Sequence, residues 1–255
     1  ALGVPDGFGY YVSTRAATLG KAGNKAVSAS FYSIHPDFIK ASLDNCREHT
    51  TFEKAAGARD AAVAPGLQQL TPEICEPLAT MSPALWNAAE KLPLSGRALF
   101  ASLLDWPRHE DPLTSAWLAV NAIREWRGDT HWAIMTSENI DGTMAGILDN
   151  AKHNYDDQWL PRSRGADDEA ISSAFKKLAE RGLANGEEVT TKGLEFREEL
   201  ERKLNNMASA AWRNLGIDQT IQFLELIEPV GSRYMDHIDR TAGSKWMPAG
   251  REVRS

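Results

Sequence analysis

The sequence has few cysteines, no long apolar run and no excess of positive charge. Cys46 and Cys75 are the only two cysteines in 255 residues, which is too few for a disulfide framework, and their spacing matches no zinc site. No run approaches the roughly 18 consecutive apolar residues of a membrane-spanning helix. The first residues also lack the basic and apolar segments of a secretory signal. We therefore expect a soluble, cytoplasmic protein with reduced thiols and no membrane partner.

Motifs of several common enzyme classes are absent as well. The sequence contains no phosphate-binding loop, dinucleotide-binding glycine pattern, His-Glu-x-x-His zinc motif or nucleophile elbow in a suitable context. A net charge of −7 argues against non-specific binding to nucleic acids, because such binding depends on Lys and Arg side chains that neutralise phosphates. The sequence therefore predicts no metal site and leaves any cofactor unknown.

What is present is a mainly α-helical pattern with very few strand signals. Asp111 and Pro112 begin the clearest helix, because Asp can cap free N–H groups and Pro has no N–H to lose at the first helical position. We expect this helix to end at Gly128 and Asp129 to cap the next one. The expected parts are a helical, ligand-binding part at 1–128, a winged-helix part at 129–240 and a loosely ordered tail at 241–255.

Residues 167–215 follow the order of elements in a winged helix. Asp167 is placed to cap a helix that ends at Gly182, and Asn185-Gly186 is the strongest type of local hairpin signal. Thr191 is then placed to cap a long helix that extends to about Leu215. The pattern predicts a C-terminal winged-helix module with a short β-hairpin wing, although a helical bundle with an incidental hairpin would also fit.

Three further stretches carry a family resemblance: Arg15-Ala16-Ala17-Thr18-Leu19-Gly20, Phe31-Tyr32-Ser33-Ile34-His35-Pro36 and Arg124-Glu125-Trp126-Arg127-Gly128-Asp129-Thr130-His131-Trp132. With the winged helix, they resemble the largely uncharacterised actinobacterial helix-turn-helix family related to MarR-type regulators. The resemblance covers nearly the whole chain and implies a helical fold, a setting in specialised metabolism and a homodimer formed through terminal helices such as residues 217–235. Trp126 and Thr130 depart from the histidine and glycine that the family pattern has there.

The charge of the winged module argues against tight DNA binding. In a winged helix the recognition helix enters the major groove, and basic residues contact phosphates. Here the helix begins Asp167-Asp168-Glu169, and the wing carries Glu187-Glu188. Acids near a helix N-terminus also stabilise the helix without any function. We expect weak or lost DNA binding, which Arg162, Arg164 or a basic partner surface could restore.

The densest polar group lies at the expected junction of two helices. Arg124 and Arg127 are three residues apart, so they share a helix face and could bind a carboxylate or phosphate of a ligand. His131 titrates near neutrality in its ordinary state and could act as an acid or base, with Asp129 orienting it. In the alternative interpretation, Asp129 only caps a helix and one arginine pairs with a glutamate, either Glu125 or Glu138.

The remaining candidates are aromatic residues and N-terminal polar residues. His35 could act as a catalytic base or bind a metal or haem, although a lone histidine beside aromatics is more often structural. Arg15 and Tyr32 could line the same cavity. Three tryptophans could stack on a flat aromatic ligand or simply pack in the core: Trp117, Trp126 and Trp132.

Together these features predict a small-molecule-binding protein on a MarR-like scaffold with weak or lost DNA binding. Its ligand would be aromatic or anionic. Any catalysis would be cofactor-free acid–base chemistry with His131 or His35 as the proton carrier, and whether the protein is an enzyme stays open. The alternative is a ligand-responsive MarR-like transcription regulator, which would bind DNA with a steep salt dependence. A structural interaction module is the third interpretation.

Overall fold

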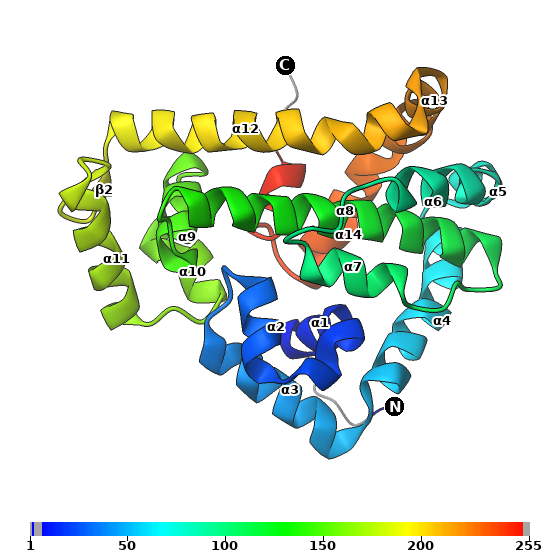
Figure 1. Ribbon diagram of the computed structural model, residues 1–255, viewed down its shortest axis with the longest axis horizontal. Helices are drawn as coiled ribbons and strands as arrows, with labels where there is room; N and C mark the ends of the chain where they lie inside the picture. The colour runs from blue at the N-terminus through cyan, green and yellow to red at the C-terminus, as the bar shows by residue number, and fades with distance from the viewer. Residues whose placement is uncertain (1, 3–6, 252–255) are drawn as a thin grey trace. The chain divides into compact units, whose positions relative to one another are not determined.

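The computed structural model describes residues 2 and 7–251. This part of the chain is mainly α-helical with one two-stranded antiparallel sheet (Figure 1), as the sequence predicts. No described helix combines the length and the apolar character needed to cross a membrane. The chain divides into two compact units. The first has residues up to 58, 94–106 and 125–208, and the second has 59–93, 107–124 and the residues from 209 onward.

The first unit begins with three helices around an apolar core. Phe31, Ile39 and Leu43 are completely buried there. The third of these helices begins at Pro36 and is capped by His35, whose Nδ1 accepts a hydrogen bond from the Asp37 N–H at 3.3 Å. The helices of this part of the unit are α1 (Phe8–Arg15), α2 (Asn24–Phe31), α3 (Pro36–His49) and α7 (Ala98–Leu104), with the 3-10 helix η1 (Ala17–Ala22).

The winged module forms the other part of the first unit. It contains α9 (Gly142–Lys152), η2 (Asp156–Gln158), α10 (Trp159–Ser163), α11 (Asp168–Glu180), β1 (Ala184–Asn185) and β2 (Glu188–Val189). The predicted order of helix, hairpin and long helix is confirmed. Ala184 pairs with Val189, and Asn185 pairs with Glu188. Gly186 has a φ of 58°, which glycine adopts without a steric cost.

A shared apolar core holds this module together. Ile147, Leu178, Leu200 and Leu204 are completely buried in it, and they come from α9, α11 and α12 (Thr191–Leu215). The cap of α12 differs from the prediction. Thr190, and not Thr191, caps the helix, because its Oγ1 accepts a hydrogen bond from the Gly193 N–H at 3.1 Å.

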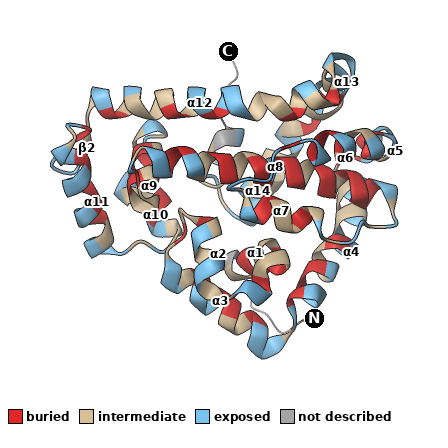
Figure 2. Cartoon of the chain, viewed as in Figure 1, coloured by how far each residue is buried: buried red, intermediate tan, exposed pale blue. Residues whose placement is uncertain are grey.

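The predicted helix end at Gly128 is wrong. Helix α8 runs without interruption from Pro112 to Ser137, and Figure 2 shows buried residues recurring along it. A glycine inside a helix costs only about 1 kcal/mol relative to alanine, which packing against other helices can offset. The expected domain boundary at residue 128 therefore falls inside a helix. The division between the two units also falls in α8, between Arg124 and Glu125.

The second unit is helical and carries none of the described strands. Inside it, the hydroxyls of Thr71 and Tyr234 are 2.5 Å apart, and the Ser115 hydroxyl accepts hydrogen bonds from Ser82 and from the Trp86 indole. Its elements are α5 (Pro72–Thr80), α6 (Ser82–Glu90), α13 (Ile217–Ile227), η3 (Glu228–Val230), α14 (Gly231–Thr241) and η4 (Pro248–Gly250); α4 (Phe52–Leu70), α8 and α12 have residues in both units.

The expected tail, residues 241–255, is described up to Arg251. Arg251 pairs with Asp239 of α14 at 2.5 Å and donates a hydrogen bond to the Trp246 carbonyl at 2.8 Å. Residues 252–255 lie outside the described part of the chain.

Candidate functional site

A buried ion pair joins the end of α1 to α8. Arg15 Nε and Nη2 lie 2.6 and 2.7 Å from the two carboxylate oxygens of Glu125, and the side chain of Glu125 is only 1% exposed. The Arg15 guanidinium also lies 4.5 Å from the centre of the Phe31 ring. Burial alone would lower the pKa of Arg15, but the charge of Glu125 raises it above its ordinary value. The pair keeps Arg15 charged and held by protein atoms.

Asp129 caps a helix, although not the one expected. Its Oδ2 accepts a hydrogen bond from the Phe100 N–H at 2.9 Å, which places it at the first turn of α7. Burial, with a further contribution from Glu125, raises the pKa of Asp129 to about 6, whereas the Phe100 N–H and Arg15 oppose the shift. Sequence reasoning missed Glu125 as a site residue. The sequence signal for Glu125 is its position four residues before Asp129, which places the two acids on one face of the helix.

His131 and Trp132 form an aromatic stack with Tyr32. The Trp132 ring lies 4.7 Å from the His131 ring and 5.2 Å from the Tyr32 ring, close to parallel with both. The Tyr32 hydroxyl donates a hydrogen bond to the Ile140 carbonyl. Among the described residues, the buried Trp132 indole N–H has no hydrogen-bond acceptor. In this stack the Tyr32 hydroxyl thus has a hydrogen-bond partner, whereas the indole N–H of the central Trp132 has none among the described residues.

His131 does not titrate near neutrality in this setting. Burial, helped by the charges of Arg127 and Arg197, lowers the pKa of His131 to about 4, and Asp149 opposes the shift. At pH 7 the imidazole is therefore neutral. Asp129 does not orient it, because residues two apart on a helix face different directions and Asp129 is bound to α7.

The other predicted residues of α8 have separate partners. Arg127 pairs with Glu201 at 2.5 Å, and Arg124 donates hydrogen bonds to Asn121 on its own helix at 3.0 and 3.2 Å. Trp126 is buried and lies 4.6 Å below the Arg97 guanidinium. In the second unit, Trp117 lies 5.6 Å from the guanidinium of Arg59.

The predicted tryptophans therefore do not share one local environment. Trp126 and Trp132 are six residues apart on α8, which separates them by about 120° around the helix axis. The structure brings Tyr32, His131 and Trp132 together, and it brings Arg15 to Glu125.

His35 has a structural position. Besides capping α3, it donates its backbone N–H to the Arg164 carbonyl at 2.8 Å, which ties α3 to the loop before α11. Within residues 2 and 7–251, no three side chains of His, Cys, Asp or Glu are grouped so that they could hold a metal ion. The interpretation of His35 as a metal ligand gains no support from its surroundings.

The outer face of the winged module exposes several acids, and two of its basic residues pair with acids. Arg162 pairs with Asp168 at 2.6 Å, and Lys177 pairs with Asp141 at 2.8 Å. Three further acids are exposed on the helix and the wing: Glu169, Glu187 and Glu188. Arg162, which could have restored DNA binding, is therefore already paired with an acid of the recognition helix.

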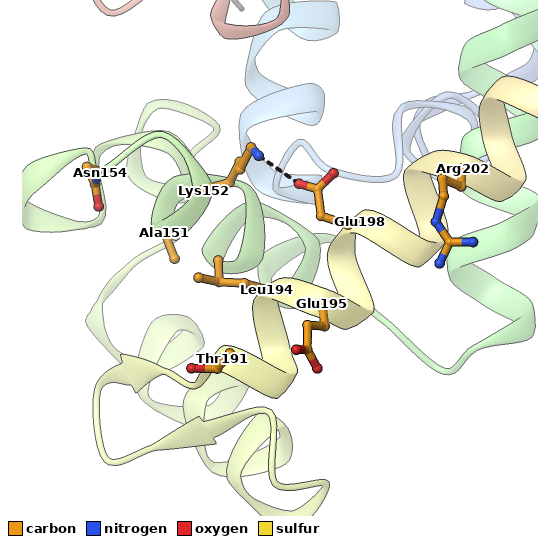
Figure 3. Close-up of a pocket in the computed structure, with 8 residues that line it drawn as sticks. All are labelled: Ala151, Lys152, Asn154, Thr191, Leu194, Glu195, Glu198 and Arg202. Carbon is orange, nitrogen blue, oxygen red and sulfur yellow. Dashed lines mark ion pairs between the residues drawn. The ribbon is translucent and has the colours of Figure 1, made fainter. Parts of the chain in front are cut away.

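An open depression of about 470 Å³ lies between the end of α9 and the start of α12 (Figure 3). Lys152 and Glu198 form an ion pair of 2.9 Å within it. The depression contains none of the predicted site residues. It is lined by Ala151, Lys152, Asn154, Thr191, Leu194, Glu195, Glu198 and Arg202.

Comparison with known families places these observations in context. Searches of curated proteins and of solved structures found no significant match. Residues 1–240 match the helix-turn-helix family, and this stretch includes both the N-terminal helices and the module of α9 to α12. This chain belongs to the helix-turn-helix family.

Proposed function

We propose that this protein binds a small aromatic or anionic molecule in its first unit, on a MarR-like scaffold whose DNA binding is weak or lost. The observation that carries the proposal is the unsatisfied indole N–H of Trp132 between Tyr32 and His131. A buried donor without a partner costs about 1–3 kcal/mol, and native proteins satisfy nearly all such groups. A flat ligand with an acceptor atom at this N–H would remove that cost.

The chemistry of the neighbouring residues favours binding over catalysis. His35 and Asp129 are both held at the starts of helices, where they accept hydrogen bonds from the Asp37 and Phe100 N–H groups. His131 is neutral at pH 7 because its pKa is lowered to about 4, and any acid–base step would use it as a weak base. The setting in specialised metabolism rests on the family resemblance alone.

The proposal is tested by identifying what the protein carries and by titrating two probes. Mass spectrometry of an extract of the purified protein should detect an aromatic metabolite. In calorimetry, 2-naphthoate should bind the wild type, and the neutral analogue 2-naphthol should bind more weakly. Trp132→Phe keeps the ring but removes the N–H, so it should weaken 2-naphthoate about tenfold, the loss of one good hydrogen bond.

Trp117→Phe is the matched control, because it removes an indole N–H from the second unit. It should leave 2-naphthoate binding unchanged. Equal binding by Trp132→Phe and the wild type would rule out the indole N–H as part of the site.

A transcription regulator is the second candidate function, and the family membership favours it. A regulator should retard its own promoter DNA at about 50 mM salt and lose most of that affinity by about 200 mM, because counterion release makes phosphate contacts salt-dependent. The absence of any shift at about 50 mM salt would exclude this function.

We also propose a homodimer that forms through α13. Ile217, Ile221 and Leu224 are 76%, 48% and 36% exposed, and their spacing of four and three residues places them on one helix face. Sedimentation of the wild type should give a dimer, and Ile221→Glu should give a monomer. A wild type that sediments as a monomer at micromolar concentration would contradict this proposal.

A further inference from the structure

The guanidinium of Arg164 is largely surrounded by protein yet has no ion-pair partner among the described residues. Arg164 follows α10 directly. Its backbone carbonyl accepts a hydrogen bond from the His35 N–H at 2.8 Å, which fixes the loop. Among the described residues, its side chain donates one hydrogen bond, from Nη1 to the Leu160 carbonyl at 3.2 Å. A guanidinium has five N–H donors, and arginines are seldom buried without a partner. Most of its donors are thus left for something else.

Arg164 shares its neighbouring carboxylate, Asp149, with another arginine. Burial lowers its pKa, and the charge of Arg15 lowers it further, whereas Asp149 and Tyr11 oppose the shift. The acid whose charge acts on Arg164 is Asp149, and its Oδ1 already accepts hydrogen bonds from Arg197 at 2.8 and 3.2 Å. Asp149 therefore acts on Arg164 without forming an ion pair with it.

The loop that carries Arg164 is held in one shape. Gly165 has a φ of 88°, a conformation that favours glycine. A Cβ at this position would lie 3.1 and 3.2 Å from the Cβ atoms of Phe38 and His35, so the loop packs closely on α3. Arg164 itself retains accessible surface, and its neighbour Tyr11 is 40% exposed. The loop thus holds in place an arginine that is only partly buried as a residue.

We propose that Arg164 binds the carboxylate or phosphate group of a small ligand. This inference rests on the proposed function and deepens it, because it assigns the anionic end of the ligand to a residue of the loop between α10 and α11. Charge-assisted hydrogen bonds from a guanidinium to such a group are strong and directional. The bound anion would also give this guanidinium a direct ion pair, which it lacks among the described residues.

The test uses calorimetry of the full-length protein with 2-naphthoate and with inorganic phosphate as probes. Arg164→Gln should weaken the binding of 2-naphthoate by about 10- to 100-fold, the loss of one charged hydrogen-bonding group. The affinity of Arg164→Lys for 2-naphthoate should lie between that of the wild type and that of Arg164→Gln. Arg162→Gln is the matched control, because it removes a nearby arginine that already pairs with Asp168, and it should bind like the wild type. If the wild type binds inorganic phosphate but not 2-naphthoate, the anionic group of the ligand is a phosphate.

Stability without ligand gives a second, independent readout. If Arg164 lacks a counter-ion, Arg164→Gln should raise the thermal midpoint of the ligand-free protein, whereas a structural arginine would give a lower midpoint. Unchanged affinity in Arg164→Gln, an equal loss in Arg162→Gln, or no binding of either probe would overturn the inference. If 2-naphthoate binding is weakened in Trp132→Phe but not in Arg164→Gln, this inference is refuted and the proposed site at Trp132 stands. If binding is weakened in Arg164→Gln but not in Trp132→Phe, the site at Trp132 is refuted and the role of Arg164 stands.

Discussion

The outer face of the winged module and the interior of the same unit place their charged residues differently. On the outer face, Glu187 and Glu188 are exposed, and Arg162 is paired with an acid. In the interior, Arg15 is buried against Glu125, and Arg164 is largely surrounded by protein but forms no ion pair among the described residues. The proposed function depends on this difference, because it predicts a small ligand in the interior and weak binding of a phosphate backbone on the outer face.

The largest expected effect comes from breaking the interior ion pair. Glu125→Leu leaves the Arg15 charge buried alone, so the free energy of unfolding should fall by about 3–5 kcal/mol, measured by urea denaturation. The double variant Arg15→Leu/Glu125→Leu should recover most of this loss, because both charges leave together.

The matched control is an exposed pair. Glu53→Gln removes the partner of Lys21, whose side chain is 87% exposed, and the denaturation midpoint should not change, because surface pairs contribute little. If Glu125→Leu were as mild as Glu53→Gln, the contrast between interior and surface would not hold.

The second effect is a pH dependence from Asp129. Its folded-state pKa of about 6 exceeds the ordinary value of 3.8, so the folded protein holds the proton more tightly than the unfolded chain. The stability that this proton provides is complete below about pH 4 and is lost as the pH rises through about 6. A shift of about two units corresponds to about 3 kcal/mol.

Asp129→Asn should isolate this effect, because Asn keeps an acceptor for the Phe100 N–H but cannot ionise. Urea denaturation should give similar stabilities for the variant and the wild type near pH 4, and a more stable variant at pH 7.5. A stability difference that does not change with pH would show that Asp129 titrates normally, despite the charges of Glu125, Arg15 and Arg97 around it.

A third effect tests the contact between the α2–α3 turn and the winged module. A Cβ at Gly142 would overlap the Tyr32 carbonyl, so Gly142→Ala should cost about 1–3 kcal/mol of stability and disturb the Tyr32–Trp132 stack. Gly57→Ala is the control, because Gly57 lies inside α4 with open space around it. That change should stabilise by about 0.5–1 kcal/mol. Equal effects of the two substitutions, measured by thermal unfolding, would contradict the close approach.

The smallest effect tests the outer face. Glu187→Lys/Glu188→Lys should increase affinity for duplex DNA about tenfold at low salt, and each new phosphate contact should steepen the salt dependence by about 0.9. The control Asp218→Lys/Glu225→Lys makes the same change in net charge on α13. If both double variants gained DNA affinity equally, net charge and not the wing would be responsible.

Local signals predicted much of the fold. The Asp111 carboxylate does cap its helix, since it accepts a hydrogen bond from the Thr114 N–H at 2.8 Å. Ile171, Phe175 and Leu178 are the buried face of α11, as their spacing predicts. Asn185-Gly186 forms the hairpin. Each of these features depends on residues within a few positions of one another, so it can be read from the sequence.

The candidate site was harder to predict because its contacts are distant in the sequence. Arg15 and Glu125 are 110 residues apart, and Asp129 caps a helix 29 residues before it. Sequence reasoning grouped Arg124, Arg127, Asp129 and His131 because they are close in the chain. The structure gives them separate partners, because successive residues of one helix face different directions.

The sequence by itself determined the helical fold, the order of the winged module and the acidity of its outer face, because periodicity, caps and turn residues act locally. Only the tertiary structure decided where the interior charges lie. It placed Arg15 against Glu125, lowered the pKa of His131 and left Arg164 without an ion pair among the residues that the structure describes. These outcomes depend on burial and on pairing across long sequence separations, and desolvation acts on a charge only once the helices have packed around it.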